Sequence, residues 1–267
     1  CFFPPPSFFP NLSPLLSSGG KGAGNRESRQ SGSMPRATVA EKLEQLEGEV
    51  LTLGSLVEGI LIEAVDLLHN SDLDALEQLG EESRQVHKKR LAIEMGCLSL
   101  IAGRRPLDGE LRSLVAMVEI ASELERMADH AQRVARANYL TADVQMRSSL
   151  TSLQRLAAKV QELLDDALTA FSNRNVSAAR AVAAGTGDAE ALYQRVRHEL
   201  MAVMKSNPRI ANQAIFLSRS AYNLRRAAER VAGICEWVVF TVEGSLGPGE
   251  PIPEISNCLQ EEISVAC

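Results

Sequence analysis

Two carboxylates at helical spacing are the residues of this sequence best placed to do chemistry. Glu125 and Asp129 lie within residues 118–138, VEIASELERMADHAQRVARAN, a stretch without Gly or Pro in which good helix formers dominate. Four residues of helix rotate the two side chains by only about 40° from each other, so both carboxylates share one face. Like charges at this spacing cost a helix roughly 0.2–0.5 kcal/mol. A bound cation or a nearby arginine can offset this cost, or the helix tolerates it.

Metal binding is one chemistry that this pair predicts. Carboxylate oxygens are hard ligands that suit Fe, Mn or Mg but not a structural tetrahedral zinc site. Two carboxylates are too few for a tight site, so neighbouring helices must add ligands. The alternative is a solvated face, with Asp129 paired to Arg133 four residues on. Asp66 with His69, and His130 beside Asp129, are weaker metal candidates, since a single His at a helix end is more often polar surface.

No catalytic constellation stands out in the sequence. There is no glycine-rich phosphate loop, no GxSxG and no Cys–His pair with a supporting context. The Glu-x-x-His signature of di-iron bundles is also missing, because no His has Glu three positions before it. We therefore expect a protein that is not an enzyme.

Composition places the chain among ordinary globular proteins. Of its 267 residues, 45% are hydrophobic, 23% charged and only 4% aromatic, which favours a core of packed helices over a β-sandwich. A net charge of −6 argues against non-specific nucleic-acid binding. Five cysteines without a CxxC pair indicate a reducing, cytoplasmic setting, with Cys97 and Cys235 in the core. No 18-residue stretch is both apolar and uncharged, so no transmembrane helix is expected.

Apolar residues recur at steps of three and four in six segments, and each predicts a helix. Asp108 is expected to cap the third helix, and Asn207 the sixth, with Pro208 at its first position. Gly244 is expected to end the sixth helix. The expected helices are 38–69, 72–101, 108–139, 150–171, 176–205 and 208–243.

The two halves of the chain repeat each other. ASELERMADHA at 121–131 lies over AYNLRRAAERV at 221–231, an offset of 100, with four identical positions. The helix breaks near Asn70 and Asn173 lie 103 residues apart, so the second repeat is slightly shorter. We predict an all-α fold of two tandem three-helix bundles related by internal duplication, at 34–145 and 146–244.

Both ends of the chain differ from the repeats. Residues 1–33 are rich in Pro, Ser and Gly and contain no basic start typical of a signal peptide. We expect Met34 to be the natural start, and 1–33 to be a disordered tail of upstream or artificially added sequence. Residues 245–267 carry three Pro and are expected to be a partly ordered C-terminal extension.

A basic run, Lys88-Lys89-Arg90, lies in the second expected helix. It is interpreted as a solvated face balanced by Glu81 and Glu82. The alternative is a contact with phosphate or lipid headgroups.

Two stretches of the sequence resemble a known family. RRPLDGELR at 104–112, leading into IASELERMADHA at 120–131, is similar to the first-repeat signature of the PhoU family of phosphate-transport accessory proteins. Residues 225–244, which close with Val-Glu-Gly, resemble the family's C-terminal signature. Members are duplicated three-helix bundles whose third helix carries an E-x-x-x-D motif, and the resemblance covers 38–244.

The resemblance implies a regulatory function. It implies a cytoplasmic regulator of phosphate uptake that binds the nucleotide-binding subunit of an ABC-type phosphate transporter, a sensor histidine kinase, or both. Such a protein damps the phosphate-starvation response, forms a homodimer and meets the membrane only peripherally, through its partners. Several members bind iron or other divalent metals at the acidic motifs.

The second repeat departs from the family pattern. Where the family has Glu and Asp, this chain has Arg225 and Glu229, which form a self-satisfying pair at i,i+4. Coulomb repulsion from Arg225 disfavours a cation there. We therefore predict a metal bound through Glu125 and Asp129, and none at Arg225 and Glu229.

Two other functions stay open beside the regulator. One is a carboxylate metal-binding helical bundle with a storage or redox role, against which the missing Glu-x-x-His motifs argue. The other is a structural helical adaptor without metal.

Overall fold

The computed structural model describes most of the two expected repeats. It covers residues 36–67, 72–103, 106–141 and 147–245, with side chains from residue 39 and, in the fourth range, from residue 151. The chain divides into two units, 1–33 and 34–267, and every described residue belongs to the second. The expected N-terminal tail lies outside the described residues, as do His69, residues 246–267 and the boundary expected at 145–146.

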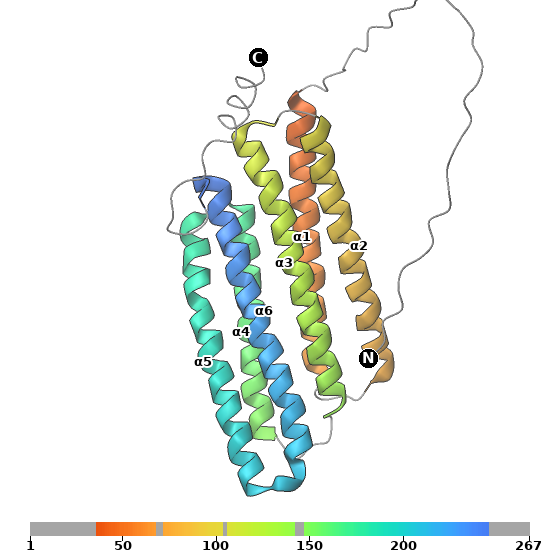
Figure 1. Ribbon diagram of the computed structural model, residues 1–267, viewed down its shortest axis with the longest axis vertical. Helices are drawn as coiled ribbons and strands as arrows, with labels where there is room; N and C mark the ends of the chain where they lie inside the picture. The colour runs from red at the N-terminus through yellow and green to blue at the C-terminus, as the bar shows by residue number, and fades with distance from the viewer. Residues whose placement is uncertain (1–35, 68–71, 104–105, 142–146, 246–267) are drawn as a thin grey trace, which may run out of the picture. The chain divides into compact units, whose positions relative to one another are not determined.

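Six long helices and one short 3-10 helix make up the described residues, without a strand (Figure 1). None of these helices is long and apolar enough to cross a membrane. The elements are α1 (Arg36–Asp66), α2 (Leu73–Gly103), α3 (Asp108–Tyr139), α4 (Arg147–Ser172), α5 (Val176–Ser206), η1 (Pro208–Ile210) and α6 (Ala211–Glu243).

Local chemistry accounts for several of the helix ends. The Asn175 side chain accepts a hydrogen bond from Ala178 N at the start of α5. The Asn207 side chain does the same for Arg209 N, with Pro208 at the first helical position, as predicted. Gly244 ends α6 with φ of +74°, a left-handed conformation that favours glycine.

The start of α3 differs from the prediction. Asp108 is already inside the helix, and the capping residue is Leu107 in extended conformation. The Leu107 side chain has no acceptor for the free N–H groups of the first turn. The capping hydrogen bond instead runs from the Leu107 backbone to a side chain inside the helix. The Glu110 carboxylate accepts a hydrogen bond from Leu107 N at 2.8 Å. Asp108 and Glu110, both in the first turn, interact favourably with the positive end of the helix dipole.

The helices form two antiparallel three-helix bundles, α1–α3 and α4–α6, as the repeat predicts. Within each bundle every helix contacts the other two. The bundles meet through α3 against α6, the most extensive contact between two helices, and through α1 against α4 (Figure 1). The all-α fold of two tandem three-helix bundles is therefore confirmed.

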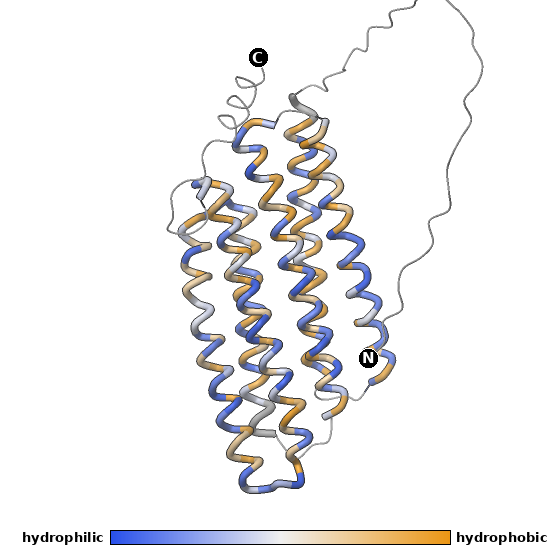
Figure 2. Tube along the Cα trace, viewed as in Figure 1, coloured by the Kyte–Doolittle hydropathy of each residue, from blue (hydrophilic) through white to orange (hydrophobic). Residues whose placement is uncertain are grey.

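Aliphatic side chains fill one continuous core across both bundles. Along each helix, apolar residues alternate with polar ones at helical spacing, which gives every helix a buried face (Figure 2). Leu53 and Ile60 of α1, Leu124 of α3 and Val231 of α6 are all fully buried or nearly so. Small residues let the helices approach closely: a Cβ at Gly96 of α2 would lie 2.7 Å from a methyl carbon of Leu46.

The seam between α3 and α6 shows the duplication directly. His130 Nδ1 of α3 lies 3.0 Å from Asn223 Oδ1 of α6. At the offset of 100, the equivalent pair is Arg230 of α6 and Glu123 of α3, whose Nη1 and Oε2 atoms lie 3.3 Å apart. The two contacts occupy equivalent positions in the two repeats. One joins an imidazole to an amide, and the other joins a guanidinium to a carboxylate.

Asn138 makes two buried hydrogen bonds at the same seam, and they have no equivalent at the corresponding positions of the other repeat. Asn138 is fully buried, and its Nδ2 donates to the Ala64 carbonyl oxygen of α1 at 2.7 Å. Its Oδ1 accepts a hydrogen bond from Ser220 Oγ of α6, also at 2.7 Å. One asparagine therefore ties three helices and both bundles together.

Candidate functional site

The first acidic motif lies on the face of α3 that meets α2. Glu125 is partly buried, with both carboxylate oxygens engaged. Oε1 lies 2.5 Å from His87 Nδ1, and Oε2 lies 2.7 Å from Arg90 Nε. The Nε–H of Arg90 is not aimed at the carboxylate, so this second contact is an ion pair and not an aligned hydrogen bond.

Arg90 is the cation that offsets the charge of this motif. Its side chain is only 17% exposed, and its Nη1 also lies 2.6 Å from Glu94 Oε2. The interpretation of 88–90 as one solvated face is therefore wrong for Arg90, because this residue turns toward α3. Lys88 and Lys89 are exposed and form no ion pair with the described residues.

Asp129 lies one turn beyond Glu125 and is exposed. Within the described residues its carboxylate has no hydrogen bond or ion pair, and the pairing with Arg133 considered as the alternative to metal binding does not form. His130, the other candidate beside it, turns instead into the seam toward Asn223. Burial lowers the pKa of His130, and Arg133, Arg226 and Arg230 lower it further, against the hydrogen bond to Asn223.

As arranged, these residues do not fit a metal centre. Both oxygens of Glu125 contact cationic or imidazole nitrogens, and Asp129 supplies only one further carboxylate. The described part of the chain brings no three His, Cys, Asp or Glu side chains together as a metal-binding group. A metal at Glu125 would have to displace Arg90, and binding through Glu125 and Asp129 stays a prediction.

The second motif is held by an internal ion-pair network. Arg225 Nη2 lies 3.0 Å from Glu229 Oε1, which confirms the pair expected at i,i+4. Arg225 Nε also binds Glu190 Oε2 of α5 at 2.5 Å, and its guanidinium lies over the Tyr193 ring, 5.4 Å from the centroid. Hydrogen bonds from Gln194 and then Arg225 lower the pKa of Glu190.

The two motifs carry the same inter-helix pair with opposite polarity. In the first repeat an acid on the third helix, Glu125, binds His87 on the second helix. In the second repeat a base on the third helix, Arg225, binds Glu190 on the second helix. Positions 87 and 190 are 103 apart and positions 125 and 225 are 100 apart, which are the offsets of the repeat. The duplicated site has thus kept its geometry and exchanged the positions of its acid and its base.

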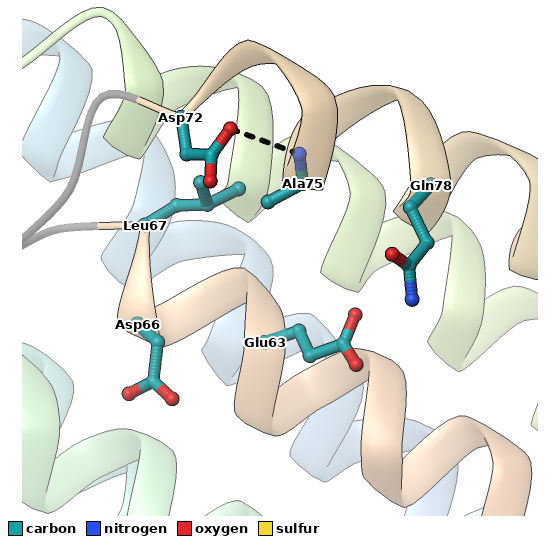
Figure 3. Close-up of a pocket in the computed structure, with 6 residues that line it drawn as sticks. All are labelled: Glu63, Asp66, Leu67, Asp72, Ala75 and Gln78. Carbon is teal, nitrogen blue, oxygen red and sulfur yellow. Dashed lines mark hydrogen bonds between the residues drawn. The ribbon is translucent and has the colours of Figure 1, made fainter.

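An acidic pocket of about 220 Å³ lies where α1 ends and α2 begins (Figure 3). Asp66 lines it, while its sequence partner His69 lies outside the described residues. Burial raises the pKa of Glu63, and the neighbouring Glu82 and Asp66 raise it further. Asp72 is engaged, because its Oδ1 accepts hydrogen bonds from the backbone N of Asp74 and Ala75. The lining residues are Glu63, Asp66, Leu67, Asp72, Ala75 and Gln78.

Sequence reasoning missed three residues that shape the candidate site. His87 and Arg90 are three apart, which places them on one face of α2, and the antiparallel neighbour α3 then brings them to Glu125. The buried Glu123 was also missed; its Oε1 binds Arg126 Nη1 at 2.5 Å. Its position between Ile120 and Met127 on the buried stripe was the available signal.

The cysteines in the described residues are structural. Cys97 and Cys235 are both buried and free. Burial raises the pKa of the Cys97 thiol to about 11 and that of Cys235 to about 12. Burial therefore favours the protonated thiol at neutral pH at both positions, which disfavours the thiolate that a nucleophile needs.

Comparison with known proteins decides the family. The model of the PhoU domain matches residues 50–137 and again residues 153–238, once in each bundle. The chain belongs to the PhoU family. The resemblance to this family is thereby confirmed in both repeats.

Individual PhoU proteins match across most of the chain. The phosphate-specific transport system accessory protein PhoU of Edwardsiella tarda is 28% identical over 203 residues, which is 76% of this chain and 84% of the relative. That of Escherichia coli strain K12 is 27% identical over the same shares.

Solved PhoU structures share the fold. The crystal structure of PhoU from Pseudomonas aeruginosa superposes with a TM-score of 0.72 at 25% identity, over 77% of this chain and 99% of that one. The phosphate transport system regulatory protein PhoU from Streptococcus pneumoniae gives 0.71 at 26% identity, over 78% and 98%.

Proposed function

We propose that this protein is a cytoplasmic, non-enzymatic regulator of phosphate uptake. In this proposal it binds the nucleotide-binding subunit of an ABC-type phosphate transporter, a sensor histidine kinase, or both, and damps the phosphate-starvation response. The match of the PhoU domain to both bundles carries the proposal, since the matched relatives are named as phosphate transport accessory proteins.

The geometry is compatible with a binding role. Long helices present extended, rigid faces. Glu125, Arg225 and Glu229 are each held in ion pairs on these faces, and Asp129 is exposed. The two sites also differ in charge: the first has an exposed Asp129, and the second has Arg225 held by Glu190 and Glu229. Such fixed charges orient a partner more than they strengthen its binding.

Co-purification tests the partners. The full chain, tagged and expressed at natural level, is recovered from phosphate-replete cells in a mild detergent that keeps the transporter assembled. The transporter's nucleotide-binding subunit is expected in stoichiometric amount, and a tagged helical bundle of similar size serves as the control. Recovery of neither that subunit nor a histidine kinase, with the transporter itself intact, would contradict the proposal.

A phosphate-uptake assay tests the regulatory part. Cells without the gene are expected to take up phosphate faster in rich medium and to express starvation genes there. The charge-altered variant Arg225→Glu is expected to restore this control less well than wild type. Complete restoration by an unrelated bundle would contradict a specific role.

The second candidate is the carboxylate metal-binding bundle with a storage or redox role. The pair Glu125 and Asp129 favours it, and the salt bridge from Arg90 opposes it. Metal analysis and oxygen consumption of the purified protein separate this candidate from the regulator. The homodimer stays part of the proposal, and light scattering of the purified chain tests it.

A further inference from the structure

The polar contacts of the α3–α6 seam follow an antiparallel arrangement. Glu123 of α3 contacts Arg230 of α6, whereas His130, seven residues further along α3, contacts Asn223, seven residues back along α6. Residues that lie between these contacts on the two helices therefore face the same stretch of the seam.

Arginines occupy the outer side of this stretch. Arg126 and Arg226 are identical at the offset of 100 and lie three or four residues from the contact residues of their own helices, so they share the seam-facing side. Their side chains are 54% and 36% exposed, so both guanidinium groups reach the surface. Arg133, three residues beyond His130, continues the row on α3 and is exposed. Together with Arg230, these residues are called the seam arginines.

The seam arginines carry more charge than their partners neutralise. Two carboxylates, Glu123 and Glu229, pair with three of them. The fourth, Arg133, forms no ion pair with any residue that the structure describes. Glu229 also contacts Arg225, but Glu190 balances that charge. The outer seam therefore has an excess of positive charge, although the chain as a whole carries −6.

Glu123 is not free to move toward the unpaired arginine. Its side chain is only 9% exposed, and its two oxygens contact Arg126 and Arg230. A Cβ on Gly233 of α6 would lie 3.4 Å from its carboxyl carbon, so the opposite helix packs closely against it. The Nε of Arg230 is likewise buried, and it has no hydrogen-bond partner in the described part of the chain. The inner seam is thus held by packing, and the excess charge stays on the outer side.

Arg133 and Arg226 lean toward each other across the seam. Starting from the contact of His130 with Asn223, Arg133 lies three residues along α3 and Arg226 three residues along α6. Because the helices are antiparallel, these steps go in opposite directions and separate the two backbone positions by about 9 Å along the axes. Helical side chains point toward the N-terminus of their helix, which turns both arginines back toward the contact.

His130 is affected by the charges of both helices. Burial is the main cause of its lowered pKa, and Arg133, Arg226 and Arg230 lower it further, against the hydrogen bond to Asn223. Cations from α3 and α6 therefore act on the same point of the seam. An anion bound at this point would interact with guanidinium groups from both bundles.

We propose that the outer side of the seam binds a phosphate dianion between Arg133 of α3 and Arg226 of α6. A guanidinium group presents its N–H donors as a planar fork that fits two oxygens of one anion. Two such forks on different helices suit a tetrahedral phosphate better than a planar carboxylate, which has only two oxygens. The exposed Asp129, next to His130, disfavours a long polyanion, so the ligand is a single phosphate group.

Calorimetric titration of the full chain with inorganic phosphate tests the site. The buffer has low salt and a slightly alkaline pH, at which phosphate is a dianion. We expect one phosphate per chain in wild type and at least tenfold weaker binding in Arg133→Gln with Arg226→Gln. The control pair Arg84→Gln with Arg195→Gln removes the same charge from arginines of α2 and α5 that are 67% and 62% exposed, and it should keep wild-type affinity.

A single variant protects the test against misfolding. Arg133→Gln alters an exposed residue without an ion pair among the described residues, so it should fold like wild type, which far-UV circular dichroism verifies. It should by itself weaken phosphate binding severalfold.

Two sources of phosphate are separated by titrating phosphoserine in parallel. Tighter binding of phosphoserine assigns the site to a phosphorylated side chain, and tighter binding of inorganic phosphate assigns it to the free ion. Both results support the site. Because the purified chain suffices, the outcome is separate from co-purification of a transporter or kinase.

The imidazole of His130 supplies a local readout. Its Cε1–H signal is followed by NMR over a pH series, and His130→Gln assigns the signal. Phosphate is expected to raise the pKa of His130, because the bound anion offsets Arg133 and Arg226. The exposed His198 of α5 is the internal control and should not respond.

Three results would overturn the proposal. One is a lack of phosphate binding by wild type. The second is equal weakening in the seam variant and in the control pair, which indicates non-specific attraction to surface charge. The third is an equal response of His130 and His198, which indicates general screening by the added salt.

Discussion

At the residue scale, Arg90 decides how the acidic motif behaves. A guanidinium 2.7 Å from Glu125 supplies the positive charge that two neighbouring carboxylates require. A metal ion would have to compete with a group that is tethered to the same fold and permanently charged. Arg90 of α2 therefore determines whether the Glu125 carboxylate of α3 is free to bind a cation.

We expect Arg90→Gln to raise the metal content of the purified protein, because it frees an oxygen of Glu125. On the sequence prediction of a metal at Glu125 and Asp129, Asp129→Asn should abolish any stoichiometric iron or manganese, whereas Arg225→Glu should leave it unchanged or raise it. Elemental analysis after incubation with each metal measures the effect, with Lys89→Gln as a control for general charge. Equal metal in wild type and Asp129→Asn would show that the motif is only a solvated face.

His130 should make stability depend on pH. Its folded pKa is lowered from 6.5, so the unfolded chain binds a proton more readily. Its contribution is complete above the unfolded pKa and is lost as pH falls from 6.5 through the lowered folded pKa. Urea unfolding at several pH values should show this loss in wild type but not in His130→Gln. His198→Gln, which alters an exposed histidine, should keep the pH dependence.

At the scale of elements, sequence periodicity predicts the helices and their buried faces. It does not predict which side chains of neighbouring helices contact each other. Runs such as Leu53, Val57 and Ile60 fix a buried face, and Asn207, Pro208 and Gly244 fix helix ends. Partners across helices depend on rotation and register, which a single sequence does not state. The sequence around His87 does not indicate its contact with Glu125, which lies 38 residues further along the chain on the neighbouring helix. The Arg225–Glu229 pair was predictable because both residues lie on one helix.

Asn138 should be the most sensitive polar residue of the seam. Asn138→Leu removes the acceptor of the Ser220 hydroxyl and a donor to α1, within a fully buried site. A loss of about 1–3 kcal/mol in the free energy of unfolding is expected. Denaturant titration measures it. Because Ser220→Ala removes only one member of the chain, it should cost less, and an equal or larger cost would contradict this assignment.

The reversed charge pair in the second bundle predicts rescue. Arg225→Glu gathers three carboxylates with Glu190 and Glu229 and should lower stability by about 0.5–1.5 kcal/mol at low salt. Adding Glu190→Arg should recover part of this loss, since it restores the polarity found in the first bundle. Thermal unfolding at low and high salt provides the measurement. No recovery in the double variant would mean that the two sites differ in geometry.

At the scale of the whole molecule, the extensive contact of α3 with α6 should make the two bundles unfold together. Trp237, the single tryptophan, lies in α6 and reports the second bundle, whereas far-UV circular dichroism reports both. The two urea transitions are expected to coincide. Asn138→Leu weakens the seam, so in that variant the transitions should begin to separate. Separate transitions in wild type would contradict one cooperative unit.

The contacts along the α3–α6 seam differ between the two repeats, so the first half of the molecule pairs better with the second half than with another first half. Two first halves from different chains would set Glu123 against His130 in place of Arg230. They would also set the buried Asn138 against Ile120, which offers no hydrogen bond. Glu123 and His130 can still hydrogen-bond, but the buried Asn138 Oδ1 loses its donor, so exchange of halves between molecules is penalised at that position. A duplicated protein that meets many copies of itself is thus directed to close on its own second half.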